Sequence, residues 1–406
     1  MNVLHINTYQ EGGAAWCAKR ISNTLLNQGI YSKILFTEGE PSKNVYIAKR
    51  NEDIWYSNPL KGKIKHLLMR TNWFNDAEKW DKILKEANNR LPEKLFLHHP
   101  FSLYKSLVHH PLVEWADIIH LHWVADFIDY PSFFKEMKKP IVWTLHDMNP
   151  AIGAMHFTSE NTPIPSELFK IEEQLKRIKR KAIRQCKAPI HIVALSEKMR
   201  DIISSSEVFT GQQTSIIHNG VDTKLFKPKC SKERRPATFM FSSYDIWDKR
   251  KGLCRIIEAL EKIDAPNKSL IVVGANWNSK PISAPFPIAE LGLIKDQKHL
   301  AELYSEADFF INASYEEGFA QTPLEAMACG TPVISTPCSG ASDLIRPFNG
   351  VICNGYDSDA IASGIKEAMN GSYDSNLIRK HIIDNYDWNK IAHQYIDLYS
   401  KILYSS

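Results

Sequence analysis

Short apolar segments alternate with longer amphipathic segments along the chain, and the apolar ones are typical of buried strands. They form two series, of which the first consists of Asn2–Ile6, Ser32–Phe36, Ile118–Trp123, Ile141–Leu145 and Ile190–Leu195. The second series consists of Ala237–Ser242, Leu270–Val273, Phe309–Asn312 and Val333–Ser335. Segments with helical spacing lie between the strands, for example Ala14–Gln28, Leu253–Ile263, Pro323–Cys329 and Asp359–Met369. This alternation predicts an α/β protein with parallel sheets that helices cover on both faces.

The segment Asp222–Pro236 separates the two series. It is highly charged, contains Pro228 and Pro236 and shows no apolar period, which is typical of a linker or a domain edge. A chain of 406 residues also exceeds the size of one ordinary hydrophobic core. We therefore expect two doubly wound, Rossmann-like domains that face a central cleft, with ligands bound beyond the carboxyl ends of the strands.

Composition narrows the class of protein. Apolar residues make up 44% and charged residues 24%, as in ordinary globular proteins. The net charge of +4 argues against a nucleic-acid partner. The seven cysteines form no CxxC pair, so neither a disulfide framework nor a zinc pattern is indicated, and a reducing cytoplasmic location is the simplest interpretation. No signal peptide or membrane-spanning apolar run is present in the sequence, so we expect any membrane contact to be peripheral.

The stretch from Tyr315 to Pro332 carries the first candidate chemistry. Thr322 precedes Pro323 and is followed three positions later by Glu325, which predicts a helix with Thr322 as its N-cap and Gly330 after its end. The free N–H groups at such a helix start favour an anion, especially a phosphate. On this pattern alone Glu325 is better explained as part of a capping box, and Glu317 as a solvated loop residue.

Further candidates follow other predicted strands. Gly12 and Gly13 come after the first strand and before a helix, which suits either a phosphate site or a tight turn. His120 and His122 lie on one face of a strand, which is possible metal geometry, although no third ligand is indicated. His146 ends a strand and is followed by Asp147; taken alone, it is better explained as a satisfied structural histidine.

Several of these motifs together resemble a known family. The pair Glu317 and Glu325, separated by seven residues, resembles the paired-glutamate signature of the GT-B retaining glycosyltransferases of glycosyltransferase family 4. Ile216–Pro228 and Phe309–Ile345 resemble further blocks of that family, and Trp388–Leu403 resembles its C-terminal helix that crosses back to the first domain. The resemblance implies a GT-B fold with an acceptor-binding domain of residues 1–214 plus 387–406. It implies a nucleotide-sugar-binding domain of residues 215–386.

The resemblance also implies roles for residues of the second domain. Glu325 would bind the ribose hydroxyls of the donor nucleotide, and Glu317 would contact hydroxyls of the donor sugar. Lys251 would neutralise the diphosphate, with Arg250 as the nearest substitute for an arginine that the family often has earlier in the chain. Backbone N–H groups would bind the diphosphate in the loop formed by Phe319, Ala320, Gln321 and Thr322.

For the first domain, the resemblance implies that His146 touches the transferred sugar, that Asp147 orients it or binds the acceptor, and that Gly12 and Gly13 belong to the donor site. His122 is an additional acceptor-side candidate. No metal and no other cofactor is implied, because a helix dipole and Lys251 can stand in for a cation. The loop after His146 resembles that of a subgroup with cysteines there, but this chain has none, so the loop is held differently or serves another acceptor.

The function that the resemblance implies is retaining transfer of a sugar from a UDP- or GDP-sugar to a hydroxyl of a saccharide or lipid-linked saccharide. The expected context is bacterial surface polysaccharide synthesis; the alternative is a non-catalytic or epimerase-like nucleotide-sugar-binding relative on the same fold. Lys170–Lys187 has eight basic residues against two acidic ones. As a helix it would suit either the anionic inner face of the cytoplasmic membrane or a solvated surface. Asn58–Arg70 is a second membrane candidate that core packing explains equally well.

Overall fold

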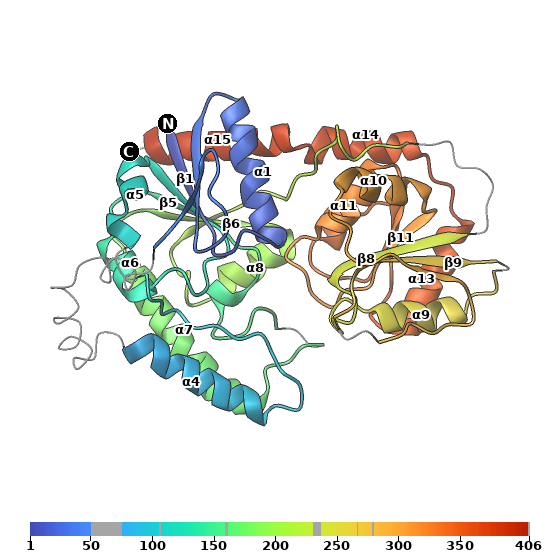
Figure 1. The fold of residues 1–406 in the computed structure, drawn as a ribbon, viewed down its shortest axis with the longest axis horizontal. Coiled ribbons are helices and arrows are strands. Elements are labelled where there is room, and N and C mark those ends of the chain that lie inside the picture. Colours follow the sequence, from blue (N-terminus) through green and yellow to red (C-terminus); the bar gives the residue numbers. More distant parts are fainter. Residues whose placement is uncertain are drawn as a thin grey trace. The chain divides into compact units, whose positions relative to one another are not determined.

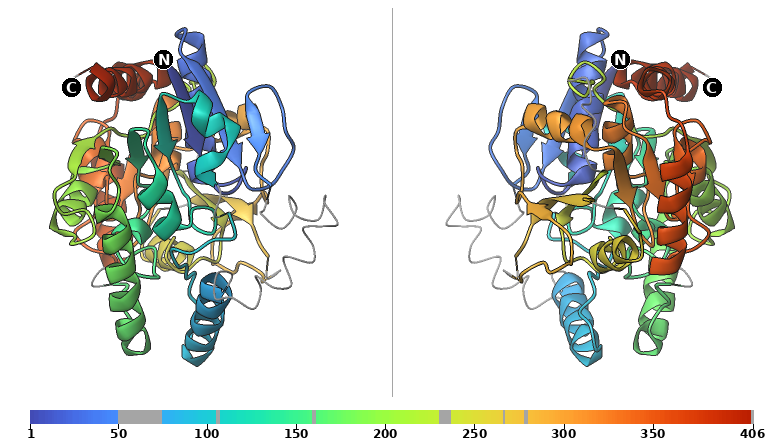
Figure 2. Two further views of the ribbon diagram at one scale, coloured as in Figure 1. Left: turned by 90° about the vertical axis from the view of Figure 1, so that its left-hand side faces the viewer. Right: turned by 90° about the vertical axis from the view of Figure 1, so that its right-hand side faces the viewer.

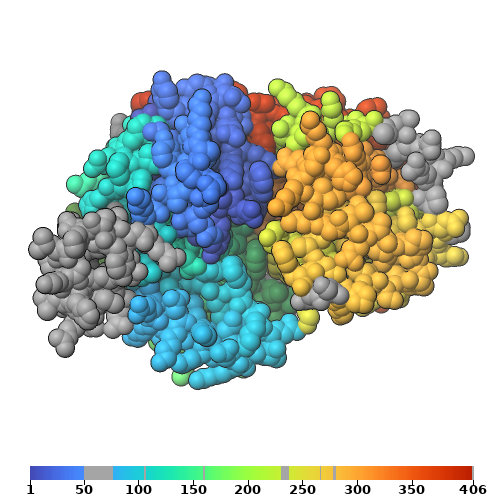
Figure 3. Space-filling view, viewed as in Figure 1, coloured from blue at the N-terminus to red at the C-terminus, as the bar shows by residue number. Residues whose placement is uncertain are grey.

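The chain divides into two compact units, residues 1–217 with 392–406 and residues 218–391. The computed structural model describes residues 1–49, 75–104, 107–158, 161–229, 237–265, 267–277 and 280–404. In the space-filling view of Figure 3, the first unit carries the blue to green colours of the early chain and the second carries yellow to orange. The division lies within a few residues of the boundaries that the sequence suggests.

The first unit is built on one parallel sheet with the strand order β3-β2-β1-β4-β5-β6-β7 (Figure 1). Its inner strands are buried along nearly their whole length, because helices cover both faces of a parallel sheet. The strands are β1 (Asn2–Ile6), β2 (Tyr31–Phe36), β3 (Val45–Ile47), β4 (Ile118–Leu121), β5 (Ile141–Thr144), β6 (Ile190–Ala194) and β7 (Gln213–Ile216). The helices are α1 (Gly13–Asn27), α4 (Asn75–Arg90), α5 (Pro111–Trp115), α6 (Tyr130–Glu136), α7 (Phe169–Arg184) and α8 (Glu197–Ser205).

The second unit repeats the plan with the parallel strand order β10-β9-β8-β11-β12-β13. Its strands are β8 (Thr238–Asp245), β9 (Ser269–Ala275), β10 (Ile288–Glu290), β11 (Phe309–Asn312), β12 (Val333–Ser335) and β13 (Gly350–Ile352). Its helices are α9 (Leu253–Glu261), α10 (Gln297–Glu306), α11 (Gln321–Ala328), α12 (Ala341–Leu344), α13 (Ser358–Asn370) and α14 (Ser375–Tyr386). The predicted class, two doubly wound parallel-sheet domains, is confirmed.

Each sheet has a point at which the chain reverses the direction of strand order. In the first unit this point lies between β1 and β4, and in the second it lies between β8 and β11. The connections that leave the two strands cover opposite faces of the sheet, so a crevice opens beyond their carboxyl ends. The loops after these strands are therefore the places where each unit can hold a ligand.

The strands that the sequence did not indicate are β3, β7, β10 and β13. The first three are partly exposed along their length and pair with only one neighbour. A strand that is buried on fewer sides needs no continuous apolar run, so its pattern is weak. β13 has three residues and begins at Gly350, whose added Cβ would lie 2.1 Å from the carbonyl oxygen of Val333.

Helix α15 (Trp388–Tyr404) completes the first unit through two tyrosines. The hydroxyl of Tyr399 hydrogen-bonds with Nδ1 of His120 at 2.6 Å, and the hydroxyl of Tyr395 with Oγ1 of Thr144 at 2.9 Å. His120 Nε2 and Thr144 Oγ1 lie 2.8 Å apart, so the four groups form one buried chain. Both marked ends of the chain lie near each other in the views of Figure 2. The C-terminal helix thus satisfies polar groups inside the N-terminal sheet.

Replacing Tyr399 by phenylalanine tests this docking. The change removes the hydroxyl and leaves a ring nitrogen of His120 without its partner in a fully buried position. We expect the free energy of unfolding to fall by about 1–3 kcal/mol in denaturant titration. Tyr404→Phe is the control, because Tyr404 is 78% exposed on the same helix. Equal stability of the two variants would contradict a stabilising role for the buried chain.

Candidate active site

The start of helix α11 differs from the sequence prediction. The N-cap is Ala320, with φ −65° and ψ 133° and no capping side chain, and the helix begins at Gln321. The prediction that Thr322 is the N-cap of a capping box with Glu325 was therefore wrong. The N–H groups in the first turn of a helix have no intrahelical acceptor, so a proline, which lacks an N–H, fits at any position of that turn. Pro323 therefore does not mark the first residue of α11, which is Gln321.

The end of α11 agrees with the prediction. Gly330 follows the C-cap Cys329 with φ +80°, its N–H donates to Met327 O at 2.9 Å, and Thr331 N–H donates to Ala326 O at 3.0 Å. This pair of bonds satisfies the last carbonyls of the helix in the manner of a Schellman motif. Gly330 is required because a residue with a side chain rarely adopts this φ.

Glu325 is a buried carboxylate that a tyrosine from another helix holds. Tyr304 of α10 donates its hydroxyl hydrogen to Oε2 of Glu325 at 3.2 Å, and Glu325 is only 7% exposed. Burial, followed by the charge of Glu325, raises the pKa of Tyr304 well above its usual value, so the tyrosine remains a donor. The position of Glu325 is thus set by tertiary packing rather than by a helix cap. Sequence reasoning missed Tyr304, because no local pattern relates residues 304 and 325.

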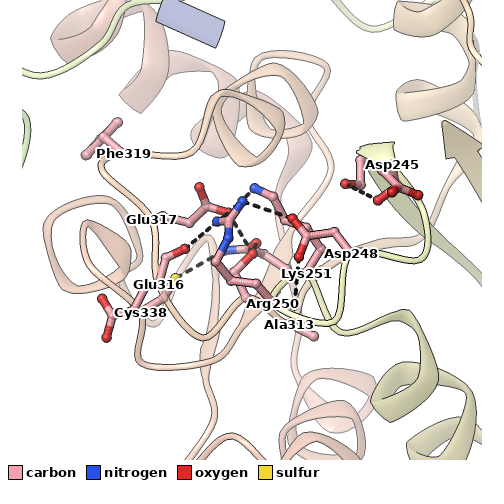
Figure 4. A network of polar contacts seen from close by, with 12 residues as sticks. Asp245, Asp248, Arg250, Lys251, Ala313, Glu316, Glu317, Phe319 and Cys338 are labelled. Carbon is pink, nitrogen blue, oxygen red and sulfur yellow. Dashed lines mark hydrogen bonds and ion pairs between the residues drawn. The ribbon is translucent and has the colours of Figure 1, made fainter. Parts of the chain in front are cut away.

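Glu317 is the centre of a network of charges that joins the loops after β8 and β11 (Figure 4). Lys251 forms an ion pair with Oε1 of Glu317, and Arg250 Nη1 lies 3.8 Å from the same oxygen. Ser314 donates its hydroxyl hydrogen to this oxygen at 2.7 Å. Arg250 Nη1 also donates to the carbonyl oxygen of Glu316 at 2.8 Å. The structure therefore brings together Lys251, Arg250 and Glu317, which the sequence marked separately.

The network keeps Glu317 ionised. Burial by itself would raise the pKa of the carboxyl group, whose side chain is 11% exposed. The charges of Lys251 and Arg250 and the hydrogen bonds from Lys251 and Ser314 outweigh burial, and the pKa of Glu317 is lowered. Glu317 is therefore an acceptor-only group at neutral pH, which suits contact with hydroxyl groups.

Gly252 positions Lys251 at the start of α9. It adopts φ +84°, and an added Cβ would lie 2.6 Å from the carbonyl oxygen of Ala313, which lies in the loop that follows β11. The backbone N–H of Tyr315 donates to the carbonyl oxygen of Arg250 at 2.9 Å, which joins the two loops directly. The close approach of the two backbones is what places Lys251 beside Glu317.

A small pocket adjoins the start of α11. Phe319 and Ala320, two of the residues expected at a diphosphate, line it together with Gly340. Asn219 donates its amide hydrogen to the carbonyl oxygen of Phe319 at 3.0 Å and so holds the loop. Gln321 and Thr322 lie in the first turn of α11, where backbone N–H groups have no intrahelical acceptor.

The first unit gathers His122, His146 and Asp147 around a small pocket. His122 Nδ1 lies 3.1 Å from His146 Nε2. Oδ2 of Asp147 accepts a hydrogen bond from Trp123 Nε1 at 2.7 Å and lies 2.6 Å from Nδ1 of His156. Burial would raise the pKa of Asp147, but His156 and the other hydrogen-bond donors lower it.

Gly12 and Gly13 lie where β1 leads into α1. Gly12 is the N-cap of the helix, with φ +92°, and within the described residues no atom beyond the chain neighbours lies within 4 Å of a Cβ built on either glycine. The space beside this helix start lets a ligand approach the backbone, which is compatible with the expected donor contact.

His120 of β4 and His122, which follows the strand, have a third neighbour that the sequence did not reveal. His5 of β1 is paired in register with His120, and His5, His120 and His122 offer ring nitrogens within 4.8 Å of one another. Both ring nitrogens of His120 and of His122 already contact other side chains. A metal ion would have to displace these contacts, so the geometry favours hydrogen bonding, and the expected absence of a metal stays a prediction.

The loop after Asp147 is held by two buried charges of α7. The carboxylate of Glu172 accepts hydrogen bonds from the backbone N–H groups of Gly153, Ala154 and Met155 at 2.7–2.8 Å. Lys179, which is fully buried, donates to the carbonyl oxygen of Gly153 at 2.6 Å. Burial lowers the pKa of Lys179 to about 7. The loop therefore keeps its conformation without the cysteines seen in the family subgroup.

These contacts change the interpretation of the basic segment Lys170–Lys187. Lys179 faces inward, whereas Lys170, Arg177 and Lys181 are among the exposed basic residues. Across the described ranges, every helix is too short or too polar to cross a bilayer. Contact of this segment with a membrane surface stays a prediction, and Asn58–Arg70 lies outside the described residues.

Comparison with known proteins shows the family and the fold of this chain. Residues 11–225 match the family model Glycosyltransferase Family 4, and residues 229–386 match the model Glycosyl transferases group 1. The GDP-mannose:cellobiosyl-diphosphopolyprenol alpha-mannosyltransferase of Xanthomonas campestris is 26% identical over 310 residues, which cover 72% of this chain and 76% of that protein.

Two solved structures share the fold over nearly the whole chain. Sucrose-phosphate synthase from Thermosynechococcus elongatus has a TM-score of 0.68 at 17% identity and covers 100% of both chains. The Anabaena protein HepE in complex with UDP-glucose has a TM-score of 0.61 at 15% identity and covers 99% of this chain and 100% of that chain. At such identities the structures support the fold alone.

The fold and the sequence matches define a glycosyltransferase of the GT-B class. The chain belongs to glycosyltransferase family 4.

Gly252→Ala tests how the Lys251 loop is held. The substitution combines an unfavourable positive φ with the close approach to Ala313 O. Gly292→Ala is the matched control, because Gly292 has φ +68° but an added Cβ would meet no atom within 4 Å from the described part of the chain beyond its neighbours. We expect the control to lose about 1 kcal/mol of unfolding free energy and Gly252→Ala to lose clearly more, as measured by denaturant titration. Equal losses would show that the approach of the two loops does not constrain residue 252.

Proposed function

We propose that the protein catalyses retaining transfer of a hexosyl group from a nucleoside diphosphate sugar to a hydroxyl of a saccharide acceptor. The observation that carries this proposal is the ion pair of Lys251 with Glu317 beside the start of α11. It lies beyond the carboxyl ends of β8 and β11, where the strand order of the second sheet reverses. This is the position at which doubly wound sheets bind nucleotides.

The charges of this site suit a diphosphate leaving group. The ammonium group of Lys251, the guanidinium of Arg250 and the positive end of the α11 dipole are all favourable to an anion. We propose that Lys251 transfers its contact from Glu317 to the diphosphate when the donor binds. Glu317 then has an ionised oxygen available to accept hydrogen bonds from the donor sugar. Catalysis would depend on positioning and on stabilisation of the charge that develops on the diphosphate.

Glu325 is proposed to bind the ribose hydroxyls. A carboxylate suits two neighbouring hydroxyls because each of its oxygens accepts hydrogen bonds. Tyr304 holds one of these oxygens from the protein side and so orients the group. UDP or GDP would serve equally in this contact, because both contain ribose.

The acceptor is proposed to bind the first unit at the pocket lined by His146 and Asp147. The Xanthomonas relative is a mannosyltransferase named for transfer to a diphosphopolyprenol-linked saccharide, which supports a lipid-linked saccharide as acceptor. This acceptor would place the reaction in surface polysaccharide synthesis at the cytoplasmic face of the membrane. No carboxylate is proposed as a nucleophile, so retention would follow from substitution on one face of the sugar, assisted by the leaving phosphate. No metal is proposed, because Lys251 and the helix N-terminus take its place.

Lys251→Ala tests the proposal directly. We expect kcat/KM for donor turnover to fall by about 10²–10³-fold, because a preorganised cation at the leaving group is lost. The control is Lys262→Ala, which removes an exposed lysine that contacts Ser358 and Asp359 on α13. Turnover is measured as nucleoside diphosphate release from UDP- and GDP-sugars. A melting temperature that falls sharply only in Lys251→Ala would indicate a structural role instead, and tight nucleotide binding without any turnover would favour the non-catalytic alternative.

Glu325→Gln tests ribose binding. The amide keeps the shape of the side chain but loses its charge and one acceptor, so we expect the donor KM and the Kd for UDP or GDP to rise by about tenfold. Tyr304→Phe removes only the hydrogen bond to the carboxylate, and we expect a smaller change in the same direction. Nucleotide Kd is measured by calorimetry. Unchanged nucleotide binding in both variants would exclude the ribose contact.

A further inference from the structure

A continuous row of histidines runs from the interior of the first unit to the pocket that holds His146. Nδ1 of His5 lies 2.9 Å from Nε2 of His122, and Nδ1 of His122 lies 3.1 Å from Nε2 of His146. The ring centroids of His5 and His122 lie 5.2 Å apart with 27° between the ring planes, and those of His122 and His146 lie 5.4 Å apart with 26°, so neighbouring rings meet edge to edge, as in-plane hydrogen bonds require. His5 and His122 are buried, whereas His146 is half-buried and lines the pocket.

The three rings are neutral. Burial lowers the pKa of His5 to about 3, and it lowers that of His122 well below the usual value with help from neighbouring histidines. Burial also lowers the pKa of His146 to about 4, although Asp147 opposes the shift. A neutral imidazole has one N–H and one lone pair, so each ring that donates through one nitrogen must accept through the other. The hydrogen bonds along the row must therefore all point the same way, either from His5 towards His146 or from His146 towards His5.

The inner end of the row favours one of the two directions. Nε2 of His5 is buried and has no hydrogen-bond partner among the residues that the structure describes. In one direction this nitrogen carries a lone pair, and in the other it carries a hydrogen. Buried N–H groups without acceptors are rarer in proteins than acceptors without donors, so the lone pair belongs at Nε2. Nδ1 of His5 then carries the hydrogen and donates to His122.

The direction chosen at the inner end decides which nitrogen of His146 carries the hydrogen. If His5 donates to His122, then His122 donates through Nδ1 to Nε2 of His146, and the hydrogen of His146 must lie on Nδ1. Asp147 lines the same pocket and raises the pKa of His146 through its charge. In this direction His146 keeps an N–H for a ligand, whereas in the opposite direction it keeps a lone pair.

We propose that His5 and His122 are positioning residues that hold His146 as its Nδ1–H tautomer, so that it presents a hydrogen-bond donor to a hydroxyl or ring oxygen of a bound saccharide. The saccharide part of this inference depends on the proposed transferase function, whereas the tautomer does not. The row makes His146 selective, because a ring locked as a donor rejects a ligand group that can only donate. His5, whose ring lies two residues along the row from the pocket, thereby influences recognition without touching the ligand.

The tautomer is measured without any substitution. Long-range ¹H–¹⁵N correlation spectra of protein labelled on histidine distinguish the two neutral tautomers, and the spectrum of His146→Gln identifies the signals of residue 146. We expect His146 to carry its hydrogen on Nδ1, with Nε2 as the unprotonated nitrogen, at neutral pH. Observation of the hydrogen on Nε2 would overturn the proposal and leave the transferase function untouched.

A matched pair of variants tests the control by His122. His122→Asn keeps an N–H donor close to the position of Nδ1, whereas His122→Leu has a similar volume and no donor. We expect His146 to remain the Nδ1–H tautomer in His122→Asn and to become a mixture in His122→Leu. We also expect kcat/KM to fall about tenfold or more in His122→Leu and to be largely rescued in His122→Asn. Equal tautomers and equal kinetics in the two variants would overturn the role of His122.

His5→Phe provides the second test and keeps a ring of similar size in the core. We expect it to loosen the tautomer preference of His122 and so of His146, while the fold is retained as judged by thermal unfolding. If His122→Leu fails to fold, this variant and the wild-type spectrum decide the question. A protein that transfers no sugar at all but shows the Nδ1–H tautomer would refute the transferase and leave the tautomer assignment standing.

Discussion

The candidate chemistry of both units depends on one constraint, the parallel pairing of strands at the point where the strand order reverses. β1 pairs with β4 in the first unit, and β8 pairs with β11 in the second. Parallel strands end at the same edge of a sheet, so the loops that follow them meet there. Lys251 and Glu317 lie in two such loops, and the row of histidines begins inside one such pair. These residues are far apart along the chain, and without this pairing they would also be far apart in space.

Burial at these edges decides the protonation of the groups and therefore their chemistry. Glu317 stays ionised because Lys251, Arg250 and Ser314 compensate for the loss of water. The histidines have no compensating charge of that strength and become neutral, which turns them into directional hydrogen-bond partners. The same physical cost of desolvation thus produces a charged site in one unit and a neutral row in the other.

The sequence predicted the central strands well, because buried parallel strands have continuous apolar runs. β1, β11 and β12 have the expected bounds. Edge strands such as β3 and β10 were missed, because partial exposure removes that pattern. The start of α11 was misplaced, since a proline is compatible with several positions of the first turn. The residues that the family signature marks could be named from the sequence as candidates, whereas their neighbours Ser314 and Tyr304 could not.

The sequence by itself determined the alternation of strands and helices, the family to which the chain belongs and the residue types available for binding a diphosphate. These depend on local pattern and on short motifs, which a linear chain displays. Only the tertiary structure decided that Lys251 pairs with Glu317, 66 positions away, and that His5 contacts His122, 117 positions away. Such contacts depend on which strands become neighbours and how far each loop reaches. They result from the packing of the whole sheet, and no single segment encodes them.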